Sequence, residues 1–260
     1  MNQLTPIVKV LLFLNVGLFL GQSFLGLDVI DTLGLRCVLS PHFRPYQFLS
    51  HLFVHADNNH LISNMFALFT FGPVLEKTLG ARRFIALYLL TGLGAAALYA
   101  GLQYMQVGEL EALYRGYLAL PDPESFVAFL NHFSHATCSA YEDFTAAFWQ
   151  YPDEIAYIAR SKAIIGQLYM LKANIPTVGA SGAVFGLLTA FAMLFPNAEL
   201  YLYFSPYPVK AKYLIVMYGL YEVYAGIKDS PTDNVAHFVH LGGILFAYFF
   251  IKWCRKRHYC

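Results

Sequence analysis

The chain has 260 residues, of which 58% are hydrophobic and only 13% are charged, and its formal net charge is +1. Soluble domains are about 25% charged, so most of this chain must lie in lipid or in a large buried core. The near-neutral charge excludes a nucleic-acid-binding surface, and without a glycine-rich phosphate loop or a Cys-x-x-Cys pair we expect no cofactor and no metal.

Six segments approach the roughly 20 apolar residues that a helix needs to cross a bilayer. They are residues 7–26, 60–78, 82–104, 181–196, 209–227 and 236–254. The first is too long and too apolar for a cleaved signal peptide, so we interpret it as a retained membrane helix. The second and fourth begin with polar or small residues, which fits helices whose first turns face a wet cavity inside a bundle.

Lys and Arg residues in the short loops predict the orientation, because they favour the cytoplasmic side. The inner loops and the C-terminal tail would carry Lys77, Arg82, Arg83, Lys210, Lys212, Lys252, Arg255, Lys256 and Arg257, against Arg36, Arg44 and Lys228 outside. We therefore predict cytoplasmic termini and a plasma (inner) membrane protein. This orientation places His60, Ser181 and His240 on one face at one depth.

Residues 105–175 interrupt this pattern with acidic residues and prolines. Apolar residues at helical spacing, such as Phe126, Phe129 and Phe133, predict two or three amphipathic helices in an extramembrane insertion on the outer side. The insertion would lie within a single domain spanning 1–260. We expect it either to tune substrate access without supplying catalytic groups or to be a passive decoration.

Two cysteines, Cys37 and Cys138, would both lie on the outer side under this topology. They could form a disulfide there, or they could remain free thiols. Spacing along the sequence does not distinguish the two, because it does not show proximity.

Ser181 lies between Gly179 and Gly182 at the start of a predicted membrane helix. Free backbone N–H groups at a helix start can stabilise an oxyanion, which suits a serine nucleophile. The alternative is a packing motif, since Gly182 and Gly186 form a Gly-x-x-x-Gly pair.

A histidine base could come from the last predicted helix. His240 precedes Gly243, which pairs with Ala247 at small-x-x-x-small spacing and predicts close helix contact. His237 lies one turn earlier on nearly the same face, so spacing alone does not choose between the two histidines.

A polar cluster of His51, His55, His60 and Asn64 runs into the second segment, with His60 and Asn64 on one helix face. Its histidines could be metal ligands, but no carboxylate accompanies them at ligand spacing. Donors for an oxyanion fit the cluster better.

These residues make the chain similar to the rhomboid intramembrane serine proteases. The resemblance rests on four motifs that occur in family order: His51–Asn64, Gly72–Gly80, Gly179–Gly182 and His240–Gly243. It covers residues 7–104 and 176–254.

The resemblance implies an all-α, six-transmembrane-helix bundle with a Ser–His dyad and no carboxylate. Ser181 would be the nucleophile, His240 the general base, and His60, Asn64 and the Ser181 N–H the oxyanion hole. Glu76, Gly179, Gly182 and Gly243 would support the structure. One departure concerns the anchoring of the first outer loop, where Tyr46-Gln47 replaces the family's usual aromatic-Arg pair.

The implied function is a serine endopeptidase that cleaves single-span or polytopic membrane proteins near their outer end. The lipid bilayer is its other partner. A catalytically silent rhomboid-like binder of membrane clients is one alternative, which the retention of Ser181, His240, His60 and Asn64 argues against. A polytopic transporter would predict broken helices in corresponding halves and usually a repeat, and the sequence has neither.

Overall fold

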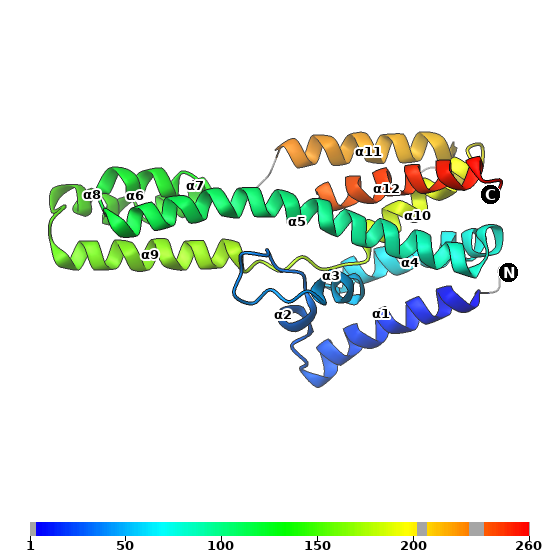
Figure 1. Cartoon of the computed structure of the whole chain (residues 1–260), viewed down its shortest axis with the longest axis horizontal. Coiled ribbons are helices and arrows are strands. Elements are labelled where there is room, and N and C mark those ends of the chain that lie inside the picture. Colours follow the sequence, from blue (N-terminus) through cyan, green and yellow to red (C-terminus); the bar gives the residue numbers. More distant parts are fainter. Residues whose placement is uncertain (1–3, 202–206, 229–236, 260) are drawn as a thin grey trace. The chain divides into compact units, whose positions relative to one another are not determined.

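The computed structural model describes residues 4–201, 207–228 and 237–259. The fold is mostly helical and divides into two compact units (Figure 1). The first unit comprises Met1–Leu35, Arg44–Tyr99 and Pro176–Cys260, and the second comprises Arg36–Phe43 and Ala100–Ile175.

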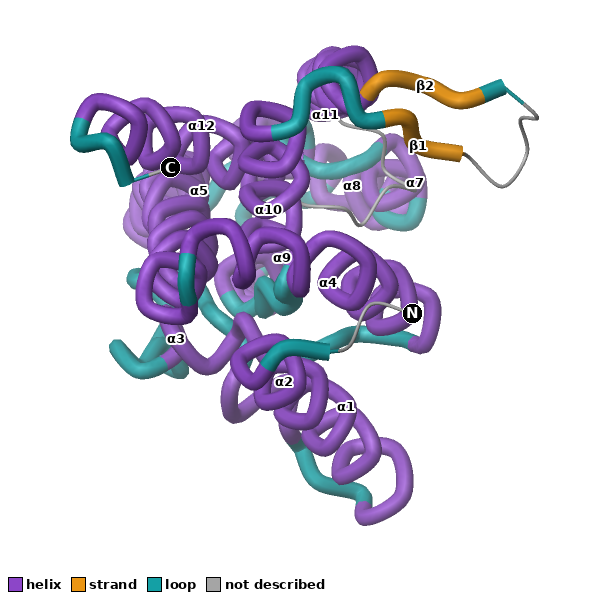
Figure 2. Tube along the Cα trace, turned by 90° about the vertical axis from the view of Figure 1, so that its right-hand side faces the viewer, coloured by secondary structure: helices purple, strands orange, loops and turns teal. Residues whose placement is uncertain are grey.

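The first unit contains the predicted catalytic residues. Its helices are α1 (Pro6–Leu25), α2 (Val29–Leu33), α3 (Gln47–Ser50), the short 3-10 helix η1 (His51–Phe53), α4 (Asn58–Leu79), α10 (Ser181–Leu194), α11 (Ala211–Lys228), α12 (His237–Lys256) and the first half of α5 (Ala81–Ala119). Two short antiparallel strands, β1 (Glu199–Tyr201) and β2 (Pro208–Lys210), pair with Leu200 opposite Val209 and lead into α11 (Figure 2).

Each of the six predicted segments corresponds to a helix, but one boundary is wrong. The third segment was expected to end at residue 104, whereas α5 continues to Ala119. The reason is that good helix formers follow and the first proline comes only at Pro121.

Among the described residues, α1, α5 and α12 are long and apolar enough to cross a membrane, and α10 is a shorter apolar helix. The chain is therefore an integral membrane protein of helical class. Six crossings remain a prediction.

Local sequence signals explain how the helices begin and end. Pro6 occupies the first turn of α1, where its missing N–H costs nothing, and Gly26 ends the helix at a φ of 62°. The Asp57 side chain caps α4 by accepting a hydrogen bond from the His60 N–H at 2.9 Å. Gly80, at a φ of 78°, separates α4 from α5.

The core of the first unit is apolar and draws on α1, α4, α5, α10 and α12. Its most buried members include Val8, Leu68, Leu75, Phe84, Leu87, Tyr88, Ala183, Leu187, Ala190, Ala247 and Ile251. The outer faces are apolar as well: Phe13, Phe24, Ile62, Phe66, Met217 and Leu220 are each more than half exposed. A helix that is apolar on all sides suits a lipid environment.

The second unit has its own aromatic core. It combines the end of α5 with α6 (Pro123–Leu130), α7 (His135–Ser139), α8 (Glu142–Gln150) and α9 (Ile155–Ala173). Buried members include Cys37, Tyr117, Phe126, Phe129, Leu130, Phe148, Ile165 and Leu168. The prediction of two or three helices for residues 105–175 was too low. Short helices such as α7 were missed because they contain too few residues to show a helical repeat of apolar side chains.

Cys37 and Cys138 do not form a disulfide in the structure. Both are free thiols, and the Cys138 Sγ donates to the Leu130 carbonyl at 3.3 Å. The disulfide alternative is therefore wrong. Cys260 lies outside the described residues.

Candidate active site

Ser181 is the first residue of α10, and the chain leading to it is held in place by backbone contacts. Leu35 and Thr177 exchange two hydrogen bonds of 2.9 and 2.7 Å, and the Gly179 N–H donates to the His51 carbonyl at 3.0 Å. Gly179 has a φ of 121°, a conformation that residues with a Cβ rarely adopt. The loop therefore fixes the start of α10, where backbone N–H groups are free.

The helices that carry Ser181 and His240 approach each other closely. A Cβ on Gly243 would lie 2.1 Å from the Gly182 carbonyl oxygen, so only glycine allows this backbone contact. His240 also stacks on Phe185, with ring centroids 4.2 Å apart and planes 10° from parallel. Because Phe185 follows Ser181 by about one turn of the same helix, the stack brings His240 to the N-terminal end of α10, where Ser181 lies.

No hydrogen bond joins Ser181 and His240, both of which are described residues. Catalytic hydrogen bonds are often loose before substrate binds. The two residues share the site through the stack on Phe185 and the close approach of their helices.

His60 lies over the turn that precedes Ser181. A Cβ on Gly179 would be 2.5 Å from the His60 Nε2 and 3.7 Å from the Ser181 Oγ, so all three surround one small space. His60 is also close enough to His240 for the two imidazoles to interact electrostatically. Asn64 is buried one turn further along α4, and its Nδ2 donates to the His60 carbonyl at 2.9 Å, which leaves a second amide N–H.

The other two histidines of the polar cluster are buried in the loop before α4. The Nδ1 of His51 lies 2.9 Å from the Gln47 carbonyl, and the ring of His55 meets that of His60 edge-on at 5.0 Å. Burial lowers the pKa of His51 to about 4, against the raising effect of the Gln47 carbonyl. Burial and the neighbouring His60 lower the pKa of His55 to about 3. Both rings therefore stay neutral at physiological pH.

The Tyr46-Gln47 departure has a structural role in this loop. The buried Gln47 Oε1 accepts from the Arg44 N–H at 3.1 Å, and the Tyr46 hydroxyl donates to the Thr32 carbonyl at 3.1 Å. These hydrogen bonds anchor the first outer loop, although Gln47 replaces the arginine that is usual in the family.

Glu76 belongs to α4, and its side chain lies elsewhere in the first unit, beside the N-terminus of α1. Its carboxylate accepts hydrogen bonds from the Thr5 Oγ1 at 2.5 Å, the Ile7 N–H at 3.2 Å and the Val8 N–H at 3.0 Å. An anion at a helix N-terminus satisfies free N–H groups and complements the helix dipole. Glu76 thus joins α4 to α1.

One residue of the site was missed by the sequence analysis. Glu222 of α11 is buried, and its Oε2 lies 2.6 Å from the Nδ1 of His237 and 3.0 Å from the Nδ1 of His240. The expectation that no carboxylate lies beside His240 is therefore wrong. A signal was available, since Glu222 is the only charged residue between Lys212 and Lys228 in an apolar helix, and such residues are functional candidates by default.

In the described part of the chain, the same three side chains form a group that could hold a metal ion. Glu222, His237 and His240 each offer one donor atom, all within 4.8 Å of one another. The histidines 51, 55 and 60, for which a metal was considered, are not such a group.

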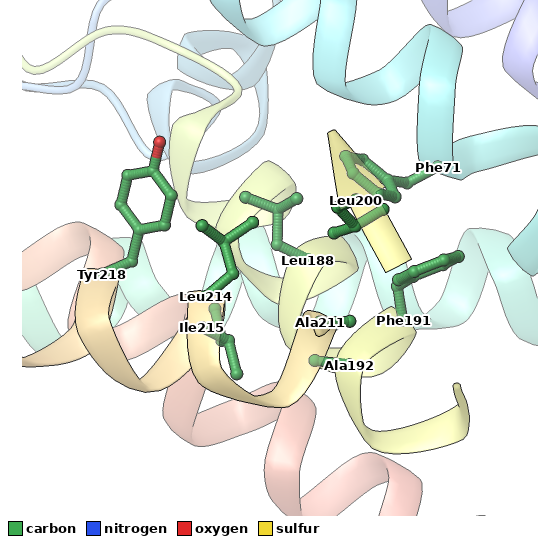
Figure 3. A pocket seen from close by; sticks show the side chains of 9 residues that line it. All are labelled: Phe71, Leu188, Phe191, Ala192, Leu200, Ala211, Leu214, Ile215 and Tyr218. Carbon is green, nitrogen blue, oxygen red and sulfur yellow. The ribbon is translucent and has the colours of Figure 1, made fainter. Parts of the chain in front are cut away.

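An apolar pocket lies further along α10, away from Ser181 (Figure 3). It is lined by Phe71, Leu188, Phe191, Ala192, Leu200, Ala211, Leu214, Ile215 and Tyr218. These residues come from α4, α10, β1 and α11. Leu188 follows Ser181 by seven residues, about 10 Å along the helix axis.

Comparison with known proteins identifies the family. The family model described as "Rhomboid domain" matches residues 42–113 and 155–257, more than half of the chain. Rhomboid-like protein 11, chloroplastic, of Arabidopsis thaliana is 34% identical over 87 residues, which cover 33% of this chain and 29% of the relative. RHOMBOID-like protein 12, mitochondrial, of the same organism is 24% identical over 217 residues, which cover 82% of this chain and 47% of the relative.

The chain thus spans less than half the length of either relative. The family match includes α4, α10 and α12, which carry His60, Ser181 and His240. The chain belongs to the rhomboid family.

Proposed function

We propose that this protein is an intramembrane serine endopeptidase that hydrolyses peptide bonds of membrane proteins, with Ser181 as nucleophile and His240 as general base. The stack of His240 on Phe185, one turn after Ser181, is the observation that carries the proposal. The stack supports the proposal because it holds an imidazole near the start of the helix whose first residue is Ser181, where backbone N–H groups are free.

The chemistry would follow the serine-protease pattern. The Ser181 Oγ attacks the scissile carbonyl carbon while the Nε2 of His240 takes the hydroxyl proton. The resulting oxyanion is stabilised by the Ser181 N–H and by His60 and Asn64. His240 then gives its proton to the leaving amine, and a water molecule, deprotonated by the same base, hydrolyses the acyl-enzyme.

The apolar side chains beside α10 suit a membrane-protein substrate. A peptide bond bound at Ser181 would leave the following apolar residues of a spanning segment about 10 Å deeper, near Leu188. Leu188, Ile215 and Phe71 form an apolar lining there.

The orientation with both termini in the cytoplasm, and residence in the plasma (inner) membrane, belong to this proposal and rest on the Lys and Arg bias. The two relatives carry chloroplastic and mitochondrial in their names. A reporter fused after residue 260 and tested for protease protection in intact cells shows on which side of the membrane the C-terminus lies.

The decisive experiment is reconstitution in liposomes with model single-span substrates. We expect the wild type to cleave, and a fluorophosphonate probe to label it at Ser181. The Ser181→Ala variant should do neither. If the folded wild type binds the substrates but neither cleaves them nor reacts with the probe, it would instead be a silent binder of membrane clients.

A further inference from the structure

Glu222 is a carboxylate at the centre of α11 with only 4% of its surface exposed. The flanking residues 213–221 and 223–227 carry no charge. A buried carboxylate in an apolar helix is costly unless partners compensate for its lost hydration. The partners of Glu222 therefore indicate why it is there.

Both partners that compensate Glu222 lie on α12, which runs beside α11 (Figure 1). Its Oε2 makes a 2.6 Å hydrogen bond with the Nδ1 of His237, shorter than an ordinary N–H···O bond. The same oxygen lies 3.0 Å from the Nδ1 of His240, in an alignment that falls short of a hydrogen bond.

This contact selects which nitrogen of His240 acts as the base. A carboxylate facing Nδ1 favours the tautomer with the proton on that nitrogen. The Nε2 is then unprotonated and can accept the Ser181 proton, and the anion stabilises the imidazolium that forms.

We propose that Glu222 is a positioning residue that completes a Ser181–His240–Glu222 arrangement, with His237 holding the carboxylate in place. The inference rests on the proposed function and deepens it. It replaces a base oriented by packing alone with a base oriented by a buried anion.

Glu222 is the one charged residue of α11 that is buried. The other buried residues of that helix are Ala211 and Ala225, whereas Met217 and Leu220 are exposed. Leu214, Ile215 and Tyr218 of α11 make apolar contacts with the rest of the first unit, so Glu222 contributes a polar contact beside them.

The groups that face His240 from every packed element decide its response to pH. Among the described residues, Glu222 is the only anion that contacts His240. The other groups are His60 from α4, His237 on α12 itself and the phenols of Tyr218 and Tyr221 on α11, which pack against Phe185 and His237 respectively. Removing the Glu222 charge leaves His240 without that anionic contact.

The central test is the Glu222→Gln variant in liposomes, with kcat, KM and the pH–activity profile measured beside the wild type. We expect kcat to fall by at least about 10-fold, the loss typical when a hydrogen-bond partner that orients a functional histidine is removed. The fall could reach about 10⁴-fold, the loss known for a catalytic histidine in the wrong tautomer. KM should change little. The acid limb of the profile should move to lower pH, because the imidazolium loses its anionic neighbour. A merely structural role would not move that limb.

Glu76→Gln is the matched control, since Glu76 is also a buried carboxylate but contacts α1 and not His240. It should lower the melting temperature and leave the acid limb in place. Should Glu222→Gln fail to fold, Glu222→Asp is the second variant: its shorter side chain keeps the charge but draws it away from the Nδ1 of His240, so kcat should fall by about 10-fold or more.

A readout that does not need protease activity separates this inference from the proposed function. Nitrogen-15 NMR of histidine-labelled wild type should show His240 protonated at Nδ1, and its signal should change in Glu222→Gln. Labelling of wild-type Ser181 by the fluorophosphonate probe tests the proposed function on its own.

Three results would overturn the inference. One is a folded Glu222→Gln variant with kcat within about threefold of the wild type and an unmoved acid limb. Another is a His240 that carries its proton on Nε2 in the wild type. The third is loss of wild-type activity in EDTA with recovery on adding Zn²⁺, which would make Glu222, His237 and His240 the ligands of a required metal.

Discussion

The imidazole of His240 lies flat on the ring of Phe185, with centroids 4.2 Å apart. Aromatic pairs of this kind contribute about 0.5–1.5 kcal/mol beyond their buried area. We therefore expect Phe185→Leu to lower kcat by about 2- to 10-fold, because the base loses the surface that orients it. Phe66→Leu is the control, since Phe66 is 67% exposed on α4. Equal losses in both variants would show that the stack has no special role.

Ser181→Ala and His240→Ala should each remove nearly all cleavage, and the double variant should lose no more than either single one. Nucleophile and base act as a unit, and single losses of about 10⁶-fold are known for such units. Both variants should fold, because the side chains border a polar space. His237→Ala should be milder. If His237→Ala is inactive while His240→Ala keeps its activity, the base has been assigned to the wrong residue.

Asn64→Ala should lower kcat more than it raises KM. Losing one oxyanion donor costs about 10²–10³ in rate, and the Ser181 N–H and His60 will compensate for part of that. Steady-state kinetics on one model substrate gives both parameters. An effect on KM alone would assign Asn64 to substrate binding.

Gly243→Ala should both destabilise the protein and impair cleavage. Its Cβ would meet the Gly182 carbonyl oxygen at 2.1 Å, and backbone cannot rotate away as a side chain can. Overpacking costs about 1–3 kcal/mol, and separating α10 from α12 would also move His240. Gly17→Ala is the matched control on α1, where a Cβ meets nothing within 4 Å. Thermal unfolding in detergent should show a lower midpoint for Gly243→Ala alone.

Stability should decline on acidification because of two buried histidines. The pKa values of His51 and His55 fall from 6.5 to about 4 and about 3 on folding. Between those values and 6.5 the unfolded chain binds more protons than the folded one, so stability drops as pH falls through this window and levels off below it. The unfolding midpoint measured from pH 7 to pH 4 should show this decline.

The variants His51→Gln and His55→Gln should each flatten the decline, because each removes one of the two groups. His132→Gln is the control, as that side chain is exposed in the second unit. If the unfolding midpoint falls with pH in both test variants as steeply as in the wild type, other titratable groups cause the acid sensitivity.

The sequence by itself determined the six apolar helices and the order of the motifs, but it underestimated the number of helices in residues 105–175. The length of an apolar run and the polar residues at a helix start are local properties, so all six segments correspond to helices. For α5, the predicted C-terminal end was wrong, because the helix continues until shortly before Pro121. Ser181, with its neighbouring glycines, is a candidate from the sequence alone, because small residues at a predicted helix start can be read directly from it.

Only the tertiary structure decided which side chains meet. Glu222 lies 15 and 18 residues from its two histidine partners, on a different helix, and its contact with His240 depends on how α11 and α12 are rotated about their axes. The free state of Cys37 and Cys138 depends in the same way on packing. Hydrophobic periodicity shows that a helix has a buried face, but the contact between two helices fixes which atoms of those faces come within bonding distance.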